Sequence, residues 1–279
     1  MTTYRVLIQT KDERGLVSKV SQLFSEMSLN IISNNEFVDS EEALFFMRSE
    51  IAGENCDVKK LENGLREILP RFSQIQIVDS SKRKKIVILV TKESHCLGDI
   101  LMRTYDDELH SDIVGVFGNY DNLKLLVEKF DIQFETISHV NLDRESHAKI
   151  MKREIKKLEF DYIVLAKYMR ILPPSFVREF KHKIINIHHS FLPAFIGANP
   201  YKQAYERGVK IIGATAHFVT DDLDEGPIIG QSITQVDHTY SWKDMQKAGR
   251  DIEKIVLSKA LKLVLDDRVM LYNNRTVIF

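Results

Sequence analysis

The sequence predicts an α/β protein of two domains, a small βαββαβ domain followed by a larger domain with a mostly parallel, doubly wound sheet. Three observations support this prediction. Strand-like and helix-like patterns alternate in the order βαββαβ over the first 79 residues, and a polar segment, DSSKRKK, follows them. From Ile86 onward, near-continuous aliphatic runs alternate with amphipathic segments, as in sheets covered by helices on both faces. We therefore expect a domain over residues 1–79, a linker over 80–85 and a second domain over 86–279.

The first domain opens with an alternating apolar run at Tyr4–Gln9, which ends at the polar turn DERG. An amphipathic helix follows, because apolar residues recur at helical spacing from Leu16 to Met27. Two strands with a turn between them then predict a hairpin, and a helix and a last strand complete the domain. These four elements are expected at 30–38, 43–47, 56–68 and 74–78.

The second domain opens with the aliphatic strand Ile86–Val90, and a helix-like segment follows it. The alternation continues, so the order of elements is Rossmann-like. Further strands are expected at 113–117, 134–137, 162–166, 184–187 and 213–219, and helices at 123–130, 144–158 and 242–265. The turn after the first strand lacks the G-x-G-x-x-G pattern, so a nicotinamide cofactor is not expected.

Composition narrows the possible functions. The 279 residues, 44% of them hydrophobic, are enough for two buried cores. The formal net charge is −1 and the charges are interspersed, so neither nucleic acid nor a membrane surface is an expected partner. Cys56 and Cys96 lack the spacing of a disulfide framework or a metal site. The N-terminus has no apolar signal segment, and no apolar run approaches the roughly 20 residues of a membrane span, so a cytoplasmic location is expected.

The candidate site begins at the strand 184–187. Asn186 and His188 stand two positions apart, so on a strand their side chains point to the same side. An amide N–H can stabilise a developing oxyanion while an imidazole exchanges a proton, which suits a carbonyl that passes through a tetrahedral intermediate. Asp224 lies in an acidic turn closed by Gly226 and Pro227, and it is the candidate carboxylate.

Each candidate also has a purely structural interpretation. His188, His189 and His217 could be hydrogen-bonded core histidines, and Asp224 could hold its own turn. For His217 we expect a supporting position behind the catalytic groups, and for His189 both interpretations stay open. Adjacent His188 and His189 on a strand should point to opposite sides, so the histidines do not predict a metal site.

One long segment resembles a known family. HHSFLPAFIGANPYKQAYERGVKIIGATAHFV, followed by LDEGPIIGQ, is similar to the formyltetrahydrofolate deformylases, whose catalytic domain has the folate-dependent formyltransferase fold. The resemblance implies that Asn186, His188 and Asp224 are the catalytic triad. The chain departs from the family pattern at Asn199, where the motif GARPY has Arg, and at Tyr120, where the motif GNHD has His.

The run LAKYMRIL, residues 165–172, is similar to the folate-contacting loop of the same family. Together with the two further histidines near the triad, it implies a set of substrate-binding residues. These are Met169, Arg170, Ile171, Leu172, His189 and His217. The pocket that they imply is mostly apolar with a few polar groups, as expected for a pterin.

The first domain resembles an ACT domain, a ferredoxin-like module, through DERGLVSKVSQLF and NIISNNEFVDSEEALFFMRSE. ACT domains commonly bind small effectors, often amino acids, so the resemblance implies an effector site at Asp12, Gly15, Asn30 and Asn34. Gly15 could instead permit a tight turn, and the asparagines could satisfy loop backbone. The module also implies a homo-oligomer.

The resemblance implies hydrolysis of 10-formyltetrahydrofolate to formate and tetrahydrofolate, with no tightly bound cofactor. This reaction supplies formate for purine biosynthesis and balances the one-carbon pool. One alternative is a formyltransferase that delivers the formyl group to an amine such as glycinamide ribonucleotide. Another is a non-catalytic sensor of amino acids or folate. The ACT-like domain and His189, where the transferases usually have Pro, favour hydrolysis over transfer.

Overall fold

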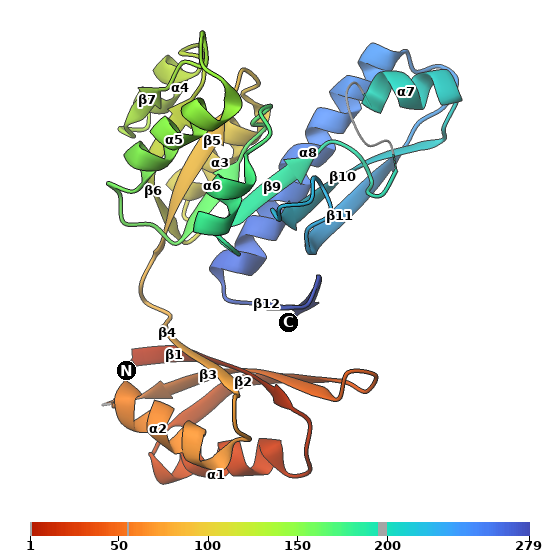
Figure 1. Cartoon of the computed structure of the whole chain (residues 1–279). Helices are drawn as coiled ribbons and strands as arrows, with labels where there is room; N and C mark the ends of the chain where they lie inside the picture. The colour runs from red at the N-terminus through yellow and green to blue at the C-terminus, as the bar shows by residue number, and fades with distance from the viewer. Residues whose placement is uncertain (1, 55, 195–199) are drawn as a thin grey trace. The chain divides into compact units, whose positions relative to one another are not determined.

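The computed structural model describes residues 2–54, 56–194 and 200–279, and it divides into two compact units (Figure 1). Unit 1 comprises the chain up to Arg83 together with Asp266–Tyr272 and Val277–Phe279. Unit 2 comprises Lys84–Leu265 and Asn273–Thr276. The structure thus differs from the sequence prediction at the C-terminus, because most residues after Leu265 pack with the first unit.

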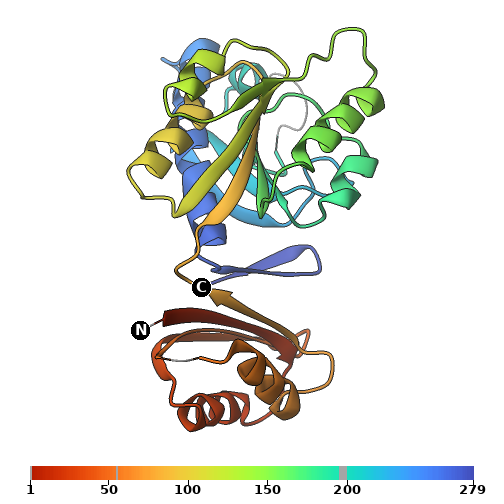
Figure 2. The same cartoon turned by 90° about the vertical axis from the view of Figure 1, so that its left-hand side faces the viewer.

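Unit 1 is the predicted βαββαβ fold. Its elements are β1 (Thr2–Lys11), α1 (Leu16–Glu26), β2 (Asn30–Asp39), β3 (Leu44–Gly53), α2 (Val58–Ile68) and β4 (Gln74–Asp79). The sheet has the order β2-β3-β1-β4 with antiparallel pairings throughout, which is the ferredoxin-like arrangement. Both helices cover one face of the sheet (Figure 2) and bury side chains such as Phe24, Leu61 and Leu65 against Val6 and Ile8.

A C-terminal hairpin covers the opposite face of this sheet. It consists of β12 (Val269–Tyr272) and β13 (Arg275–Ile278). Met270, Tyr272 and Val277 pack on Leu7 and Phe46, which alternate with the helix-facing residues of their strands. Burial of this second apolar face explains why the segment joins unit 1. The turn at Asn273, with a left-handed φ of 49°, is a hairpin signal that the sequence analysis missed.

Unit 2 is built around a seven-stranded sheet of order β11-β10-β9-β8-β5-β6-β7. The five strands from β9 to β7 are parallel, whereas β10 and β11 are antiparallel, which confirms the mostly parallel, doubly wound prediction. The strands are β5 (Lys84–Val90), β6 (Ser111–Gly118), β7 (Phe134–Thr136), β8 (Tyr162–Leu165), β9 (Ile184–His188), β10 (Ile211–Phe218) and β11 (Ile228–Gln235). The helices are α3 (His95–Tyr105), α4 (Lys124–Glu128), α5 (Arg144–Ile155), α6 (Pro174–Glu179), α7 (Pro200–Arg207) and α8 (Trp242–Leu265).

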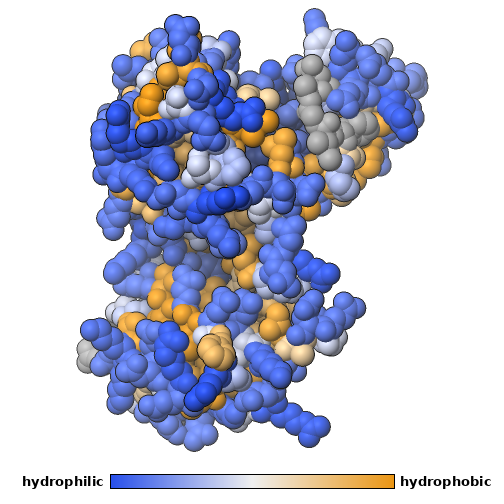
Figure 3. All heavy atoms as spheres, viewed as in Figure 1, coloured by the Kyte–Doolittle hydropathy of each residue, from blue (hydrophilic) through white to orange (hydrophobic). Residues whose placement is uncertain are grey.

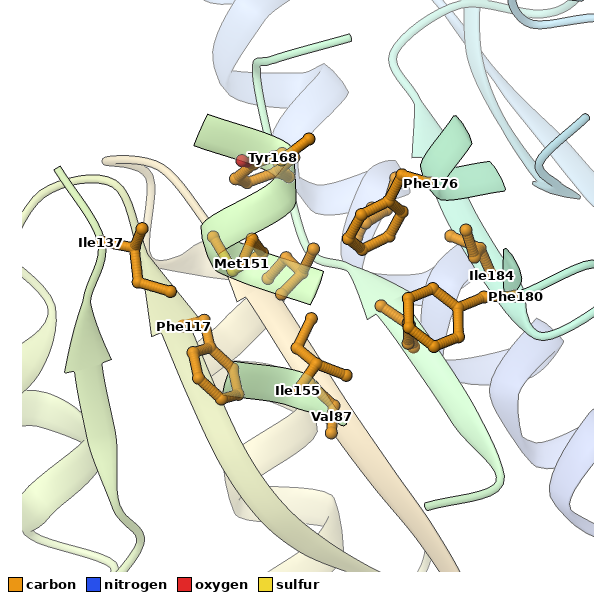
Figure 4. Close-up of a cluster of buried hydrophobic side chains, with 13 residues drawn as sticks. Val87, Phe117, Ile137, Met151, Ile155, Tyr168, Phe176, Phe180 and Ile184 are labelled. Carbon is orange, nitrogen blue, oxygen red and sulfur yellow. The ribbon is translucent and has the colours of Figure 1, made fainter. Parts of the chain in front are cut away.

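A large apolar cluster lies between this sheet and helices α5 and α6 (Figure 4). Val87 and Leu89 of β5 contribute to it, whereas Ile88 between them is equally buried but is not part of it. This is the behaviour of a central strand with helices on both faces, and it explains the unbroken aliphatic run in the sequence. β5 begins at Lys84, so the predicted linker 80–85 is shorter than expected, because its last two residues already pair with β6.

Apolar residues lie between larger hydrophilic areas on the viewed face of each unit (Figure 3). Among the described residues, no helix combines the length and apolar character that crossing a membrane requires.

Candidate active site

The candidate site lies where β9 ends and β10 pairs with it. β9 runs antiparallel to β10, and the register places Asn186 opposite His217 and His188 opposite Thr215. Directly opposed residues of an antiparallel pair have side chains on the same face of the sheet. The alternation along β9 therefore brings Asn186, His188 and His217 to one side, as the sequence predicted for the first two.

Asp224 reaches this site from the loop between β10 and β11. Its backbone is left-handed, with a φ of 59°, a conformation that Asp tolerates better than most residues. The loop closes tightly on the end of β10, since the Phe218 N–H donates to Pro227 O at 2.9 Å. A Cβ at Gly226 would lie 1.8 Å from Phe218 O, so the loop requires glycine there.

Asp224 and His188 form the central pair of the site. His188 Nδ1 lies 3.2 Å from Asp224 Oδ2, and both side chains are largely buried. Burial raises the pKa of Asp224, but the hydrogen bond from His188 and the nearby imidazoles outweigh it, so this pKa lies below its usual value. His188 Nε2 is buried and has no hydrogen-bond partner among the described residues. The pair therefore leaves one nitrogen available for proton exchange with a substrate.

His217 supports Asn186. Its Nδ1–H donates to Phe218 O at 2.9 Å, and its Nε2 lies 3.2 Å from Asn186 Nδ2. Burial lowers the pKa of His217, so a neutral ring accepts a hydrogen bond from the Asn186 amide. Although His217 Nε2 is also 3.8 Å from Asp224 Oδ1, the neutral ring makes this contact weaker than the His188 pair. The second amide hydrogen of Asn186 stays available for an oxyanion.

The predicted substrate-binding residues and the triad line one cavity of about 320 Å³, the triad cavity. Met169, Arg170, Ile171 and Leu172 form one wall of it, in the segment after β8. The Met169 N–H donates to Thr91 Oγ1 at 2.9 Å and so attaches this segment to the end of β5. Further lining residues, which the sequence did not predict, lie in the segment after β8 and in the loop between β10 and β11. They include Lys167, Tyr168, Val219, Thr220, Asp221 and Leu223.

His189 corrects the prediction that it and His188 point to opposite sides. Both line the triad cavity, and their ring centroids lie 5.2 Å apart. β9 ends at His188, so strand alternation does not extend to the next residue. Burial, together with the charge on Lys167, lowers the pKa of His189 to about 4. His189 is therefore a neutral imidazole near neutral pH.

The two departures from the family pattern have different outcomes. Tyr120 packs edge-on against His139, with ring centroids 5.1 Å apart, and the ammonium of Lys92 lies 4.1 Å from the centre of its ring. The hydrophobic and cation–π contacts account for a large aromatic residue in this loop. Asn199 lies outside the described residues.

The four predicted effector residues lie in unit 1. Gly15 caps α1 in a left-handed conformation with a φ of 85°, so a turn alone explains this glycine. Asn34 Nδ2 donates to Glu36, and its Oδ1 accepts from Ser49 Oγ at 2.6 Å. The Asp12 N–H donates to Ala43 O at 2.8 Å, and Asn30 is exposed at the start of β2. Effector binding at these positions stays a prediction.

One group of possible metal-ligand atoms occurs among the described residues, on His95, Cys96 and Glu253, within 4.8 Å of one another. Lys167 Nζ lies 3.0 Å from Glu253 Oε1, so an ammonium already neutralises this carboxylate. Burial also raises the pKa of the Cys96 thiol, which disfavours the thiolate that a metal requires. The cluster therefore fits an internal ion pair better than a metal ion.

Comparisons with known proteins agree with this geometry. The family described as Formyl transferase matches residues 84–261. A formyltetrahydrofolate deformylase of Haemophilus influenzae is 53% identical over 273 residues, which cover 98% of each chain. The crystal structure of a formyltetrahydrofolate deformylase from Pseudomonas syringae pv. tomato aligns with a TM-score of 0.95 at 40% identity, covering 100% of this chain and 95% of the other.

The chain also has a second kind of structural relative, which matches only part of it. A glycinamide ribonucleotide transformylase from Symbiobacterium toebii is 26% identical and aligns with a TM-score of 0.67. The match covers 71% of this chain and 94% of that one. A shared fold thus occurs in relatives with different names, and the residues of the site must decide between their reactions.

Proposed function

Because the chain belongs to the formyltetrahydrofolate deformylase family, we propose that it hydrolyses 10-formyltetrahydrofolate to formate and tetrahydrofolate. The observation that supports this most directly is the convergence of an amide, an imidazole and a carboxylate in one cavity. His188 adds a buried Nε2 that no described residue contacts through a hydrogen bond, which is the kind of exception expected at a reacting centre. The folate is a substrate, and the proposal includes no tightly bound cofactor.

The formyl oxygen is held by Asn186 and by protonated His188. Water adds to the formyl carbon and forms a C–O bond, and the carbonyl oxygen takes up negative charge. The amide hydrogen of Asn186 that His217 does not bind, and the His188 Nε2–H, donate to this oxyanion. His217 acts by fixing the direction of the Asn186 amide. The oxyanion then reforms the carbonyl as the C–N bond to the folate breaks, and the leaving nitrogen takes the proton that the water gave to Asp224.

Asp224 orients the attacking water and accepts its proton. Its lowered pKa keeps the carboxylate charged near neutral pH, so it can act as a base. Met169, Ile171 and Leu172 flank the pterin, and backbone groups of their loop bind its polar edge.

The test is a product assay with purified protein and 10-formyltetrahydrofolate. Formate and tetrahydrofolate should appear in equal amounts without any added amine. If folate binds but neither product appears, the chain is a sensor and the hydrolase proposal is wrong. If products appear only when glycinamide ribonucleotide is added, the chain is a transferase instead.

The proposal extends to unit 1 and to assembly. An amino-acid effector would bind near Asp12, Gly15, Asn30 and Asn34, and the enzyme would be a homo-oligomer in the cytoplasm. The ferredoxin-like topology of unit 1 supports effector binding and homo-oligomer formation, because ACT domains have this topology. Measuring the assay with and without individual amino acids, and the mass in solution, tests both. An unchanged rate with every amino acid would remove the effector site from the proposal.

A further inference from the structure

A second cavity in unit 2 opens beside the triad cavity. This side cavity has a volume of about 480 Å³. The two cavities share Lys167, Met169 and His189 as lining residues, so they are contiguous. The triad cavity already accommodates the folate in the proposed function. The side cavity is therefore the direction from which a second reactant could approach the formyl carbon.

Hydrolases and transferases of this fold differ in that second reactant. Water attack turns the formyl amide and H₂O into the free amine of tetrahydrofolate, formate and a proton. Amine attack instead moves the formyl group to the acceptor nitrogen, and the acceptor's proton goes to the folate nitrogen. The relative from Symbiobacterium toebii is named a transformylase, so the same fold serves a reaction with an acceptor. Whether the side cavity admits an amine acceptor thus decides between hydrolysis and formyl transfer.

Glu253 lines the side cavity and accepts three hydrogen bonds. Its carboxylate is fully buried in α8 and accepts from Lys167 Nζ at 3.0 Å and from Tyr201 OH at 2.6 Å on one oxygen. His95 Nε2 donates to its other oxygen at 2.7 Å. The hydrogen bonds and the charge on Lys167 overcome the effect of burial and lower the pKa of Glu253 to about 2. Both oxygens of the carboxylate therefore already accept hydrogen bonds, and an acceptor's ammonium or hydroxyl group would have to compete with these donors.

The other charged residues that line the side cavity are paired as well. Arg250 Nε lies 2.9 Å from Glu93 Oε2, and Lys202 Nζ lies 3.8 Å from Glu206 Oε1. An acceptor with a phosphate or an ammonium group would have to break one of these pairs before it could bind. The Arg250–Glu93 pair is partly exposed, so breaking it costs less than breaking the fully buried Lys167–Glu253 pair, which would leave a charge uncompensated. A water molecule enters without breaking either pair.

We propose that the Lys167–Glu253–Tyr201 network and the Arg250–Glu93 pair exclude amine acceptors from the side cavity and so commit the formyl group to water. Lys167 and Glu253 are then specificity-determining residues, although they do not touch the reacting atoms. Lys167 has a left-handed backbone conformation with a φ of 61°, an uncommon arrangement for a non-glycine residue and one that often occurs at functional sites. This inference rests on the proposed hydrolysis.

The test measures how the formyl group divides between water and an amine. Wild type, Lys167→Met and Glu93→Gln are incubated with 10-formyltetrahydrofolate and either glycinamide or phosphoethanolamine. Tetrahydrofolate, formate and the formylated amine are quantified together by mass spectrometry. Lys167→Met removes one of the two donors to Glu253 Oε1 and so leaves an acceptor site for the amine of glycinamide. Glu93→Gln frees Arg250 for the phosphate of phosphoethanolamine. Lys149→Met, at an exposed position of α5 and outside both cavities, is the matched control.

Wild type and Lys149→Met should release formate and tetrahydrofolate in equal amounts, with formylated amine only at background level. Each of the two cavity variants should raise the ratio of formylated amine to formate by about tenfold with its matching amine. Damage to the fold would lower both products and leave this ratio unchanged. Glu93→Gln alters a partly exposed pair, so it decides the question if Lys167→Met does not fold.

An unchanged ratio in variants that still hydrolyse the substrate would overturn the inference and leave the proposed function intact. Wild type that formylates either amine as fast as it releases formate would also overturn it. A wild type that releases no tetrahydrofolate at all would remove the proposed function itself, and the inference with it.

Discussion

Unit 2 contains a largely buried carboxylate, Asp224, and a fully buried one, Glu253. Each lies beside an imidazole, but their hydrogen-bond environments differ. Asp224 is on a loop, and its pair with His188 leaves His188 Nε2 without a hydrogen-bond partner in the part of the chain that the structure describes. Glu253 is in the long helix α8, and both of its oxygens are occupied. Buried polar groups are normally satisfied, so the unsatisfied nitrogen indicates reactivity and the satisfied carboxylate indicates a fixed structure. The two clusters differ in what they leave unpaired, not in residue type.

The backbone supports this difference. Asp224 has a left-handed conformation in a loop that Gly226 and the end of β10 hold closed. Glu253 has regular helical hydrogen bonds around it and approaches Tyr201 of α7 and His95 of α3. Three elements thus fix Glu253, whereas Asp224 depends on one loop. We call the Asp224–His188 pair the open cluster, and Glu253 with its three donors the closed cluster. The following predictions test whether the open cluster is needed for catalysis and the closed cluster for stability.

The largest effect is expected for Asp224→Asn. Loss of the carboxylate removes the base and the partner of His188, so kcat should fall about a thousandfold. Tetrahydrofolate affinity, measured by calorimetry, should change little, because the apolar wall of the cavity is intact. Asp222→Asn, which makes the same change in the same loop but outside the cavity, is the control. Turnover within about tenfold of wild type would refute the role given to Asp224.

Glu253→Gln should destabilise the protein by about 3 kcal/mol, because the buried ammonium of Lys167 loses its carboxylate. The free energy of unfolding in urea measures this effect. The double variant Glu253→Gln/Lys167→Met should recover part of the loss, since neither charge then remains unpaired. Strictly additive losses would mean that the two residues do not interact.

Stability should fall as the pH drops from 6.5 toward 4. The folded-state pKa of His189 is about 4, below its ordinary value of 6.5, and that of His217 is lowered too. Between these values the unfolded chain binds more protons than the native state, so the free energy of unfolding rises with pH across this window. His189→Asn should reduce the difference between pH 6.5 and 4.5 by about 2 kcal/mol. An identical pH profile in this variant would show that His189 is not held neutral.

The smallest effect is expected for Tyr201→Phe. This change removes one of three donors to Glu253, and the carboxylate keeps His95 and Lys167. The free energy of unfolding should fall by about 1 kcal/mol. Tyr205→Phe, on the same helix but exposed, should change it by less. Equal values for the two variants would argue that the Tyr201 hydroxyl adds nothing to the closed cluster.

Much of the fold was predictable, because local patterns determine it. The aliphatic run at β5 and the helical spacing in α8 are short-range signals of burial. Alternation in β9 likewise placed Asn186 and His188 on one side. The same rule failed one residue later, at His189, because the strand had already ended there. The position of a strand end depends on its partners in the sheet, and these lie far along the chain.

By itself, the sequence determined the types of element in both units and the chemical groups of the triad, since these depend on residue identity and near-neighbour spacing. Only the tertiary structure decided that the hairpin β12–β13 joins unit 1 and that Lys167 meets Glu253, 86 positions away along the chain. Such contacts depend on which apolar faces remain uncovered and which charges remain unpaired once the elements have packed. Uncovered apolar faces and unpaired charges can be identified only in the folded chain, because an apolar face costs free energy when it stays exposed to water and a charge when it is buried without a partner.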